Sequence, residues 1–243
     1  MANPYFSFKQ FTIQQDRSAM KVSTDACLFG AWVARILQKE HAAGTLLDIG
    51  TGTGLLSLML AQKNPAIRID AVELDKEAAQ QAAANVAVSP FAGQVNVIES
   101  DIRTCLLLPV YDTIISNPPF YEGDLKSTDR VRNIAHHDEG LLLEELLDLI
   151  RQKLSDKGRF YLLWPFKRKE EILLSISKKN LRLTRITTVK QTVQHNPFRL
   201  MLEGQKASDT QPETENTEMA IKDVSDQYTT AFTELLKDYY LYL

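Results

Sequence analysis

From Thr45 to Leu202 the sequence alternates short β-rich runs with longer helical runs, without an internal repeat. The first five β-rich runs are apolar almost throughout, which is typical of parallel strands buried on both faces. We expect strands over Thr45–Ile49, Ile67–Glu73, Val95–Glu99, Thr113–Ser116, Arg159–Trp164, about Leu183–Gln191 and Arg199–Glu203. Helices are expected over Leu55–Lys63, Lys76–Val88 and Leu141–Leu154. The pattern predicts an α/β fold, with a seven-stranded, mostly parallel sheet, one antiparallel edge strand and helices on both faces.

The flanking segments predict additions to this core within a single domain. A chain of 243 residues with 44% hydrophobic residues fits one large α/β domain with extensions. Residues 1–44 are rich in Phe and are expected to cover one end of the core, which spans 45–205. The polar segment 206–226 predicts a mobile loop. Residues 227–243 carry apolar side chains at three- and four-residue steps, which predicts a C-terminal amphipathic helix.

Composition argues against several classes of protein. No stretch approaches the roughly 20 apolar residues that span a bilayer, and no signal peptide pattern begins the chain. We therefore expect a cytoplasmic protein that does not contact membranes. Cys27 and Cys105 are far apart, and no metal-ligand spacing occurs, so we expect neither a disulfide framework nor a metal. Nothing in the sequence implies an oligomer.

The net charge of −3 conceals a strong asymmetry along the chain. Residues 151–190 contain 12 Lys and Arg against 3 Asp and Glu, whereas residues 207–226 contain one Lys against six acids. The basic excess is compatible with solvated helix faces or with a nucleic-acid surface. Charge alone does not choose between these two interpretations.

A glycine-rich loop follows the first predicted strand of the core. The run Asp48-Ile-Gly-Thr-Gly-Thr-Gly54 leads directly into an apolar helix. Glycines in such a loop permit positive φ and a close approach of a ligand to the backbone. The spacing departs from the dinucleotide pattern G-x-G-x-x-G, and no Walker A lysine follows. The loop therefore predicts a nucleotide-like ligand in which another group takes the place of the pyrophosphate of a dinucleotide.

This loop resembles the first motif of the class I methyltransferases, which bind S-adenosylmethionine. The resemblance implies the Rossmann-like sheet of that superfamily and places the methionine part of the cofactor beside the loop. The loop residues that it assigns to the cofactor site are Asp48, Gly50, Gly52 and Gly54.

Acidic residues end the next two predicted strands. Glu73 lies 23 residues after Gly50, a position that suits an acid accepting hydrogen bonds from both ribose hydroxyls. Asp101 ends the third strand, where class I methyltransferases usually place an acid that accepts from the adenine amino group. The resemblance places Leu74 and Ile102 against the adenine ring. An acid at a strand end is often a helix cap, but the combination with the glycine loop favours a cofactor site.

The run Asn117-Pro118-Pro119-Phe120 follows the fourth strand, at the edge where open α/β sheets bind ligands. The Asn117 side-chain oxygen and the Pro118 carbonyl are two acceptors that can aim the lone pair of an amino group at a methyl donor. Phe120 offers a flat face to a planar group. An ordinary turn is the alternative. We predict that Asn117, Pro118 and Phe120 are catalytic, with Asn117 also beside the cofactor.

This tetrad resembles that of methyltransferases acting on planar amino nitrogens: adenine N6, cytosine N4, guanine N2 or the glutamine amide. The runs at 6–15, 20–25 and 28–32 narrow the choice, because they closely resemble the bacterial tRNA (adenine N6)-methyltransferases that modify adenine 37 of valine tRNA. The likeness spans almost the whole chain. Two departures are Ser23, where we expect Gly, and the longer, more polar segment 206–226.

The resemblance implies an S-adenosylmethionine-dependent tRNA (adenine-N6)-methyltransferase whose partner is the anticodon stem-loop. Within this interpretation the basic excess gains a role in RNA binding. Lys167, Arg168 and Lys169 follow the fifth strand and are expected to hold phosphates, as is Lys21. His136 and His137 fit either RNA contacts or ordinary surface positions.

Three other functions stay open. A guanine N2 enzyme of ribosomal RNA shares the tetrad but typically has a longer N-terminal part. A protein-glutamine N5-methyltransferase normally has Tyr in place of Phe120 and a separate N-terminal helical domain, for which the residues before Thr45 are too few. An inactive methyltransferase fold that only binds RNA would be expected to have a damaged loop or tetrad.

Overall fold

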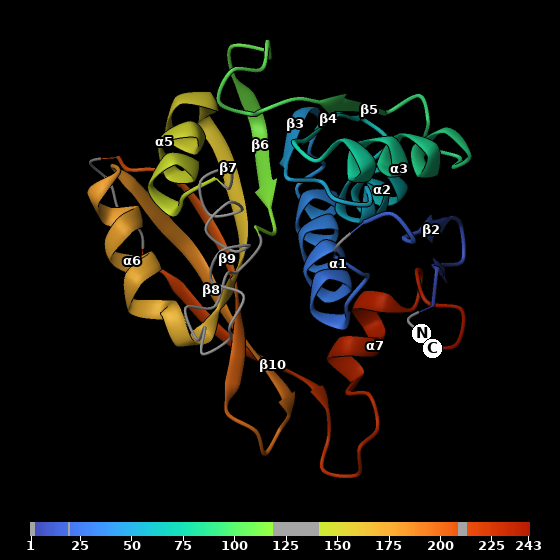
Figure 1. Ribbon diagram of the computed structural model, residues 1–243. Coiled ribbons are helices and arrows are strands. Elements are labelled where there is room, and N and C mark those ends of the chain that lie inside the picture. Colours follow the sequence, from blue (N-terminus) through green and yellow to red (C-terminus); the bar gives the residue numbers. More distant parts are fainter. Residues whose placement is uncertain (1–2, 19, 119–140, 209–212) are drawn as a thin grey trace, which may run out of the picture.

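The computed structural model describes residues 3–18, 20–118, 141–208 and 213–243, and within these ranges an eight-stranded sheet forms the centre of the molecule (Figure 1). The strands are β3 (Gly44–Ile49), β4 (Ile67–Glu73), β5 (Val95–Glu99), β6 (Tyr111–Ser116), β7 (Leu154–Pro165), β8 (Leu181–Thr192), β9 (Pro197–Lys206) and β10 (Glu215–Lys222). Their order in the sheet is β10-β8-β9-β7-β6-β3-β4-β5.

Five consecutive strands of the core, β3 to β7, are parallel to one another. The chain builds β4 and β5 on one side of β3 and then returns to add β6 and β7 on the other side. The strand order therefore reverses between β3 and β6. In open α/β sheets, ligands bind outside the carboxyl ends of the strands at this reversal.

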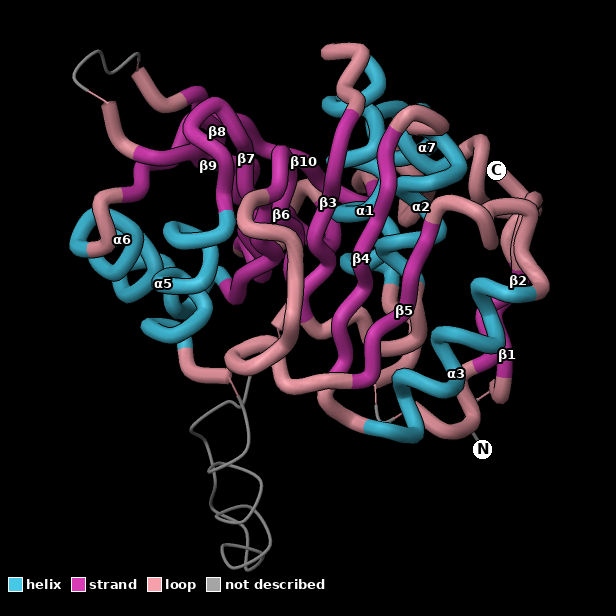
Figure 2. Tube along the Cα trace, turned by 90° about the horizontal axis from the view of Figure 1, so that it is seen from above, coloured by secondary structure: helices cyan, strands magenta, loops and turns pink. Residues whose placement is uncertain are grey.

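Helices cover both faces of the sheet, as Figure 2 shows from above. The helices are α1 (Thr24–Lys39), α2 (Leu55–Lys63), α3 (Lys76–Ala87), α5 (Leu143–Lys153), α6 (Lys169–Lys178) and α7 (Thr230–Leu236), with a 3-10 turn η1 (Phe166–Arg168) before α6. One buried cluster joins the sheet to α1, α2 and α7, and a second joins it to α5 and α6. The mostly parallel α/β fold predicted from the sequence is confirmed.

The N-terminal segment packs beside α3 and the C-terminus. It forms a small antiparallel pair, β1 (Tyr5–Ser7) and β2 (Thr12–Gln14), and buries Phe8, Phe11 and Ile13. The Lys9 N–H donates to the Tyr239 carbonyl at 2.7 Å, so the two ends of the chain lie side by side (Figure 1). The C-terminal helix was predicted over 227–243 and is shorter in the structure, where α7 spans Thr230–Leu236.

The antiparallel strand differs in position from the prediction. We expected it at the edge of the sheet, but β9 lies between β7 and β8 and is antiparallel to both. The crossover through α6 places β8 one position further out, and the β8–β9 hairpin then fills the gap. Gly204 permits the close packing there, because a Cβ at this position would lie 2.3 Å from the Phe160 ring.

Residues 206–226 were expected to form a polar loop, and the structure contradicts this for 215–222, which form β10. This strand pairs in parallel with β8 at the edge of the sheet and buries only Ile221. Polar cross-strand pairs take the place of apolar contacts, with Glu215 bound to Arg185 at 2.8 Å and Glu218 bound to Lys190 at 2.9 Å. Edge strands are commonly rich in charge. The acidic segment thus neutralises part of the basic run 151–190.

Candidate active site

The glycine loop and Asn117 meet at the reversal of strand order. The loop leaves the carboxyl end of β3, Asn117 leaves that of β6, and the two strands are paired. The Ser116 hydroxyl donates to the Ile49 carbonyl at 2.8 Å and thereby ties the two strand ends together. Two motifs that are 63 or more positions apart in sequence therefore share one edge of the sheet.

The glycine loop needs its glycines for backbone conformation. Gly50, Gly52 and Gly54 have φ of +72°, +59° and +83°, in the left-handed region where an L side chain is strained. A Cβ built at Gly50 or Gly52 would meet no atom within 4 Å. The described atoms thus leave open space directly beside the loop backbone.

The buried Asp48 side chain stabilises the glycine loop through hydrogen bonds. It is fully buried, and its Oδ2 accepts hydrogen bonds from the hydroxyls of Thr51 and Ser57, both at 2.7 Å. Its Oδ1 is buried and has no partner among the described residues. Burial raises the pKa of Asp48 to about 6, and the two hydroxyl bonds oppose that rise. Sequence reasoning identified Asp48 but not the two hydroxyls, which follow it at three and nine positions.

Glu73 lies next to the same loop. One carboxylate oxygen accepts from the Gly52 N–H at 2.8 Å, and the other accepts from the Asp75 N–H at 3.0 Å. Asp75 caps α3 by accepting from the Ala78 N–H at 2.8 Å. Leu74, between the two acids, leaves 49% of its surface exposed. The structure therefore brings Glu73 and an accessible apolar side chain to the edge of the loop.

Asp101 follows β5 and is bound by a residue that sequence reasoning missed. The Arg103 guanidinium donates from Nε to both carboxylate oxygens at 3.0 Å and from Nη2 to Oδ2 at 2.8 Å. This contact lowers the pKa of Asp101. Ile102 is half-buried and packs against the cluster under α5. The D-x-R spacing was the only signal of this pair.

Asn117 combines partial burial with an unused acceptor. Its Oδ1 is buried and has no hydrogen-bond partner among the described residues. Pro118 follows it and is half-buried. The predicted residue Phe120 lies outside the described residues, as do His136 and His137. An amide oxygen left without a donor costs free energy, which points to a ligand that supplies one.

The predicted phosphate contacts follow β7 at the same edge of the sheet. Arg168 binds Glu171 through two bonds of 2.6 and 2.7 Å and lies over the Trp164 ring. Lys169 lies 5.9 Å from the centre of the Phe166 ring, and Lys167 is exposed. Part of the predicted basic group is thus neutralised within the protein.

Lys21 is engaged in the N-terminal segment. Its ammonium donates to the carbonyl oxygens of Gln15 and Ser18. The segment is further held by Asn85 of α3, which was not predicted from the sequence. The Asn85 amide bonds both backbone groups of Gln14 and donates to the Thr53 carbonyl in the glycine loop, each at 2.9 Å. Asn85 therefore connects the N-terminal segment to the loop.

This arrangement suits the binding and orientation of a polar ligand. The Glu73 carboxylate lies against the open backbone of the glycine loop, and the Oδ1 atoms of Asp48 and Asn117 have no partner among the described residues. The described residues contain no group of three or more His, Cys, Asp and Glu side chains arranged to hold a metal ion. In the same ranges, none of the helices has the length and apolar character needed to cross a membrane.

The chain is similar to known methyltransferases. Residues 30–187 match the family model of the methyltransferase small domain. A tRNA1(Val) (adenine(37)-N6)-methyltransferase of Dyadobacter fermentans is 40% identical over 240 residues, covering 98% of each chain.

Solved structures share the fold at low sequence identity. A predicted O-methyltransferase from Agrobacterium tumefaciens superposes with a TM-score of 0.63 at 16% identity and covers 88% of this chain and 96% of its own. Magnesium protoporphyrin IX methyltransferase from Synechocystis, solved with bound S-adenosylmethionine, has a TM-score of 0.54 at 16% identity and covers 76% and 80%.

Proposed function

Since this chain belongs to the methyltransferase small domain family, we propose that it transfers a methyl group from S-adenosylmethionine to N6 of an adenine in tRNA. The substrate is adenine 37, beside the anticodon of valine tRNA. Support for this specific substrate comes from the full-length similarity to enzymes of that activity, at 36–40% identity in three relatives. Methylation of tRNA implies that the enzyme is cytoplasmic.

The cofactor site is formed by the glycine loop and the acids beside it. The open backbone at Gly50 and Gly52 would face the methionine part, and Glu73 would accept from the ribose hydroxyls. Asp101 would accept from the adenine amino group, with Leu74 and Ile102 against the ring. Asp48 and Gly54 would support the loop from within. When bound, S-adenosylmethionine supplies an electrophilic methyl group on a sulfonium.

Asn117 and Pro118 orient the attacking amine. The observation that carries this assignment is the buried, unpartnered Oδ1 of Asn117 at the carboxyl end of β6. This oxygen and the Pro118 carbonyl would accept the two N–H bonds of the adenine amino group, which favours a more tetrahedral nitrogen and aims its lone pair. The nitrogen lone pair would bond to the methyl carbon as the bond from that carbon to the donor sulfur breaks, and the electron pair of the broken bond would stay on sulfur. The nitrogen would then lose its surplus proton to water.

The target base must leave its stack to reach this edge of the sheet. Unpaired bases of a loop do so at a lower cost than bases in a duplex. We assign to Phe120 the stacking of the extruded adenine, a role that rests on its place in the tetrad. Aromatic stacking of this kind contributes about 1–3 kcal/mol per base.

The basic residues would hold the anticodon stem-loop by its phosphates. Lys167, Arg168 and Lys169 are the expected contacts, and the Arg168 charge is shared with Glu171. Lys21 keeps one N–H donor beyond the two that its carbonyl partners occupy, and it would face RNA from the N-terminal segment.

Methyl transfer to an unmodified anticodon stem-loop of valine tRNA tests this function. The RNA is incubated with labelled cofactor, digested to nucleosides and separated. We expect the label in N6-methyladenosine and its loss when adenine 37 is replaced by guanine. Label in N2-methylguanosine, or in protein glutamine with the RNA untouched, would overturn the substrate and leave the methyltransferase fold standing.

A further inference from the structure

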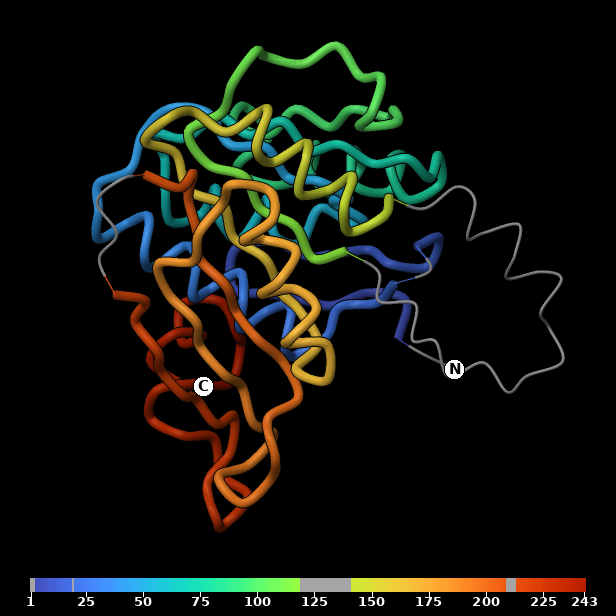
Figure 3. The backbone as a smooth tube through the Cα atoms, turned by 90° about the vertical axis from the view of Figure 1, so that its left-hand side faces the viewer, coloured from blue at the N-terminus to red at the C-terminus, as the bar shows by residue number. Residues whose placement is uncertain are grey.

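A pocket lies at the carboxyl ends of two sheet strands, outside the proposed cofactor site. Its volume is about 560 Å³, within the range of small-molecule sites. It is formed where β8 and β10 end, next to the start of α1. Figure 3 shows the turn after β8 and the turn after β10 together at one end of the molecule, and the Val193 N–H donates to the Lys222 carbonyl at 3.1 Å. Its walls include Asp25, Thr192, His195, Phe198, Lys222 and Tyr228.

One RNA molecule can reach both this pocket and the proposed catalytic site. From β8 to β6 the sheet order passes through β9 and β7, which makes three steps between neighbouring strands. Strands are spaced by about 4.8 Å, which gives about 14 Å across the sheet. The register places Ser116 level with Ile186, so β8 runs about five residues past the level of Asn117 and its end lies about 22 Å from that residue. The glycine loop lies beyond β6, on the other side. An RNA loop that places one base at Asn117 can therefore reach this pocket with a base several nucleotides away along the chain.

The charges in the pocket walls are balanced in pairs. The Asp25 carboxylate accepts from the Arg199 Nε at 2.7 Å, and the Lys222 ammonium donates to Asp226 at 2.9 Å. A phosphate would find no uncompensated cation in these two pairs. The remaining hydroxyl, imidazole and carboxylate groups can bond an uncharged polar ligand. The chemistry of the walls thus favours a base over a phosphate.

Tyr228 gives the pocket a rigid aromatic wall. Its ring stacks on the buried Phe232 with centroids 4.6 Å apart and planes inclined by 14°, and 44% of the residue surface remains exposed. The backbone before it is fixed by Asp223, whose carboxylate accepts from the Ser225 and Gln227 N–H groups. On the opposite turn, the Thr192 hydroxyl lies 2.7 Å from the His195 Nδ1 and orients that ring. Fixed aromatic rings beside hydrogen-bonding groups are how proteins capture unpaired RNA bases.

We propose that this pocket binds a second, unpaired base of the RNA substrate, several nucleotides from the methylated adenine. The inference rests on the proposed function and adds a recognition site for it. Capture of a second base would fix the position of the loop relative to Asn117 and help to distinguish one tRNA from another. The pocket acts in RNA binding and not in the methyl transfer step.

Abasic substitution across the anticodon loop tests the pocket directly. Stem-loop RNAs are prepared with one base at a time removed and the ribose kept, and their affinities are measured for the wild-type protein and Tyr228→Ala. We expect one position other than the target to weaken wild-type binding by about 10-fold. In Tyr228→Ala the intact RNA should bind about 10-fold more weakly, and removal of that base should cost less than 2-fold further.

Matched variants separate the pocket from general effects. Tyr228→Phe keeps the ring and should bind RNA as the wild type does, and Tyr242→Ala removes an exposed tyrosine outside the pocket and should have no effect. His195→Ala, in an exposed turn with little risk to folding, should lower RNA affinity with unchanged cofactor affinity and unchanged single-turnover rate at saturating RNA.

The outcomes distinguish this inference from the proposed function. If the wild-type protein methylates the stem-loop but the penalties of Tyr228→Ala and of base removal simply add, or neither variant changes RNA affinity, the pocket does not bind a base. If the wild-type protein methylates no RNA, the proposed function and the pocket assignment both fail.

Discussion

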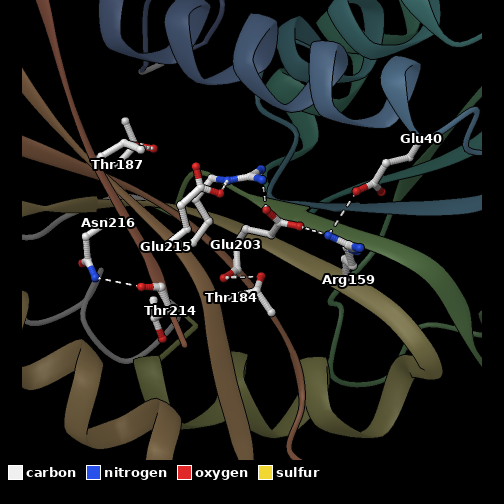
Figure 4. Close-up of polar contacts among 10 residues, drawn as sticks. Glu40, Arg159, Thr184, Thr187, Glu203, Thr214, Glu215 and Asn216 are labelled. Atoms are coloured by element: carbon white, nitrogen blue, oxygen red, sulfur yellow. Dashed lines mark hydrogen bonds and ion pairs between the residues drawn. The ribbon is translucent and has the colours of Figure 1, made fainter. Parts of the chain in front are cut away.

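Glu203 lies within the central sheet and Asn117 directly follows one of its strands, and the two polar side chains differ in their hydrogen bonding. Glu203 of β9 is 1% exposed, and its two carboxylate oxygens accept from Arg159 of β7 and Arg185 of β8 (Figure 4). Asn117 is half-buried, and its Oδ1 atom is buried without a partner among the described residues. The fold supplies hydrogen bonds to both carboxylate oxygens of Glu203, whereas the described residues supply none to the Asn117 Oδ1. Glu203 therefore stabilises the fold, whereas the Asn117 oxygen is free for the substrate contact that we propose.

The largest effect on stability should come from Glu203→Ala. The change leaves two guanidinium groups in the sheet without their shared carboxylate, and we expect a loss of about 3 kcal/mol in the free energy of unfolding, measured in urea. This value lies at the low end for buried pairs because Arg159 and Arg185 also contact Glu40 and Glu215. Glu218→Ala, which breaks an exposed pair with Lys190, should change stability by less than about 0.5 kcal/mol. Equal losses in the two variants would contradict the role given to Glu203.

Glu73→Ala should act on cofactor binding. The carboxylate at the edge of the glycine loop would be lost together with its proposed ribose bonds, and calorimetry should show affinity for S-adenosylmethionine reduced about 10-fold or more. Glu77→Ala, on the exposed first turn of α3, serves as the matched control and should bind the cofactor normally. An unchanged affinity in Glu73→Ala would remove this residue from the cofactor site.

Asp48 should make stability fall as pH rises. Burial raises its pKa to about 6 from an ordinary value of 3.8, so between these values the folded state binds more protons than the unfolded state. The contribution of Asp48 to stability is therefore present below about pH 4 and lost above about pH 6. Asp48→Asn should flatten this part of the pH profile and raise stability at pH 7 by about 1 kcal/mol relative to the wild type. Parallel profiles for the two proteins between pH 4 and 7 would contradict a protonated Asp48 in the folded state.

The smallest of these effects concerns the basic residues beside the site. Lys167→Glu combined with Lys169→Glu should weaken tRNA binding about 5-fold or more near 0.1 M salt, flatten its salt dependence and leave cofactor affinity unchanged. The matched control, Lys157→Glu with Lys178→Glu, changes the same charge at the opposite edge of the sheet. If both double variants have the same salt slope, the Lys167 and Lys169 pair belongs to the general surface and not to the RNA site.

The parts of the fold that were predictable are those determined by local sequence. The bounds of β4, β5 and α2 agree with the predictions residue for residue, because apolar runs and the glycine loop mark them. The glycine loop, Glu73 and Asp101 could be placed at one edge because they end successive parallel strands.

The parts that could not be predicted depend on partners far along the chain. β10 is polar over most of its length, and it pairs with β8, which presents matching charges to it. Glu203 looks like any surface acid until its two arginines are brought beside it. Asn85 likewise gains its role from Gln14 and Thr53, which folding brings to α3.

Asn117→Ala tests the central assignment most directly, with the single-turnover rate and the unfolding free energy measured on the same protein. If the buried oxygen serves the adenine amine, methyl transfer to the valine tRNA stem-loop should fall about 100-fold or more, with cofactor affinity largely kept. Unfolding should change by no more than about 0.5 kcal/mol, because the lost oxygen has no partner in the described fold. Full activity in Asn117→Ala would contradict the account, and so would a loss of activity that follows only from a loss of folded protein.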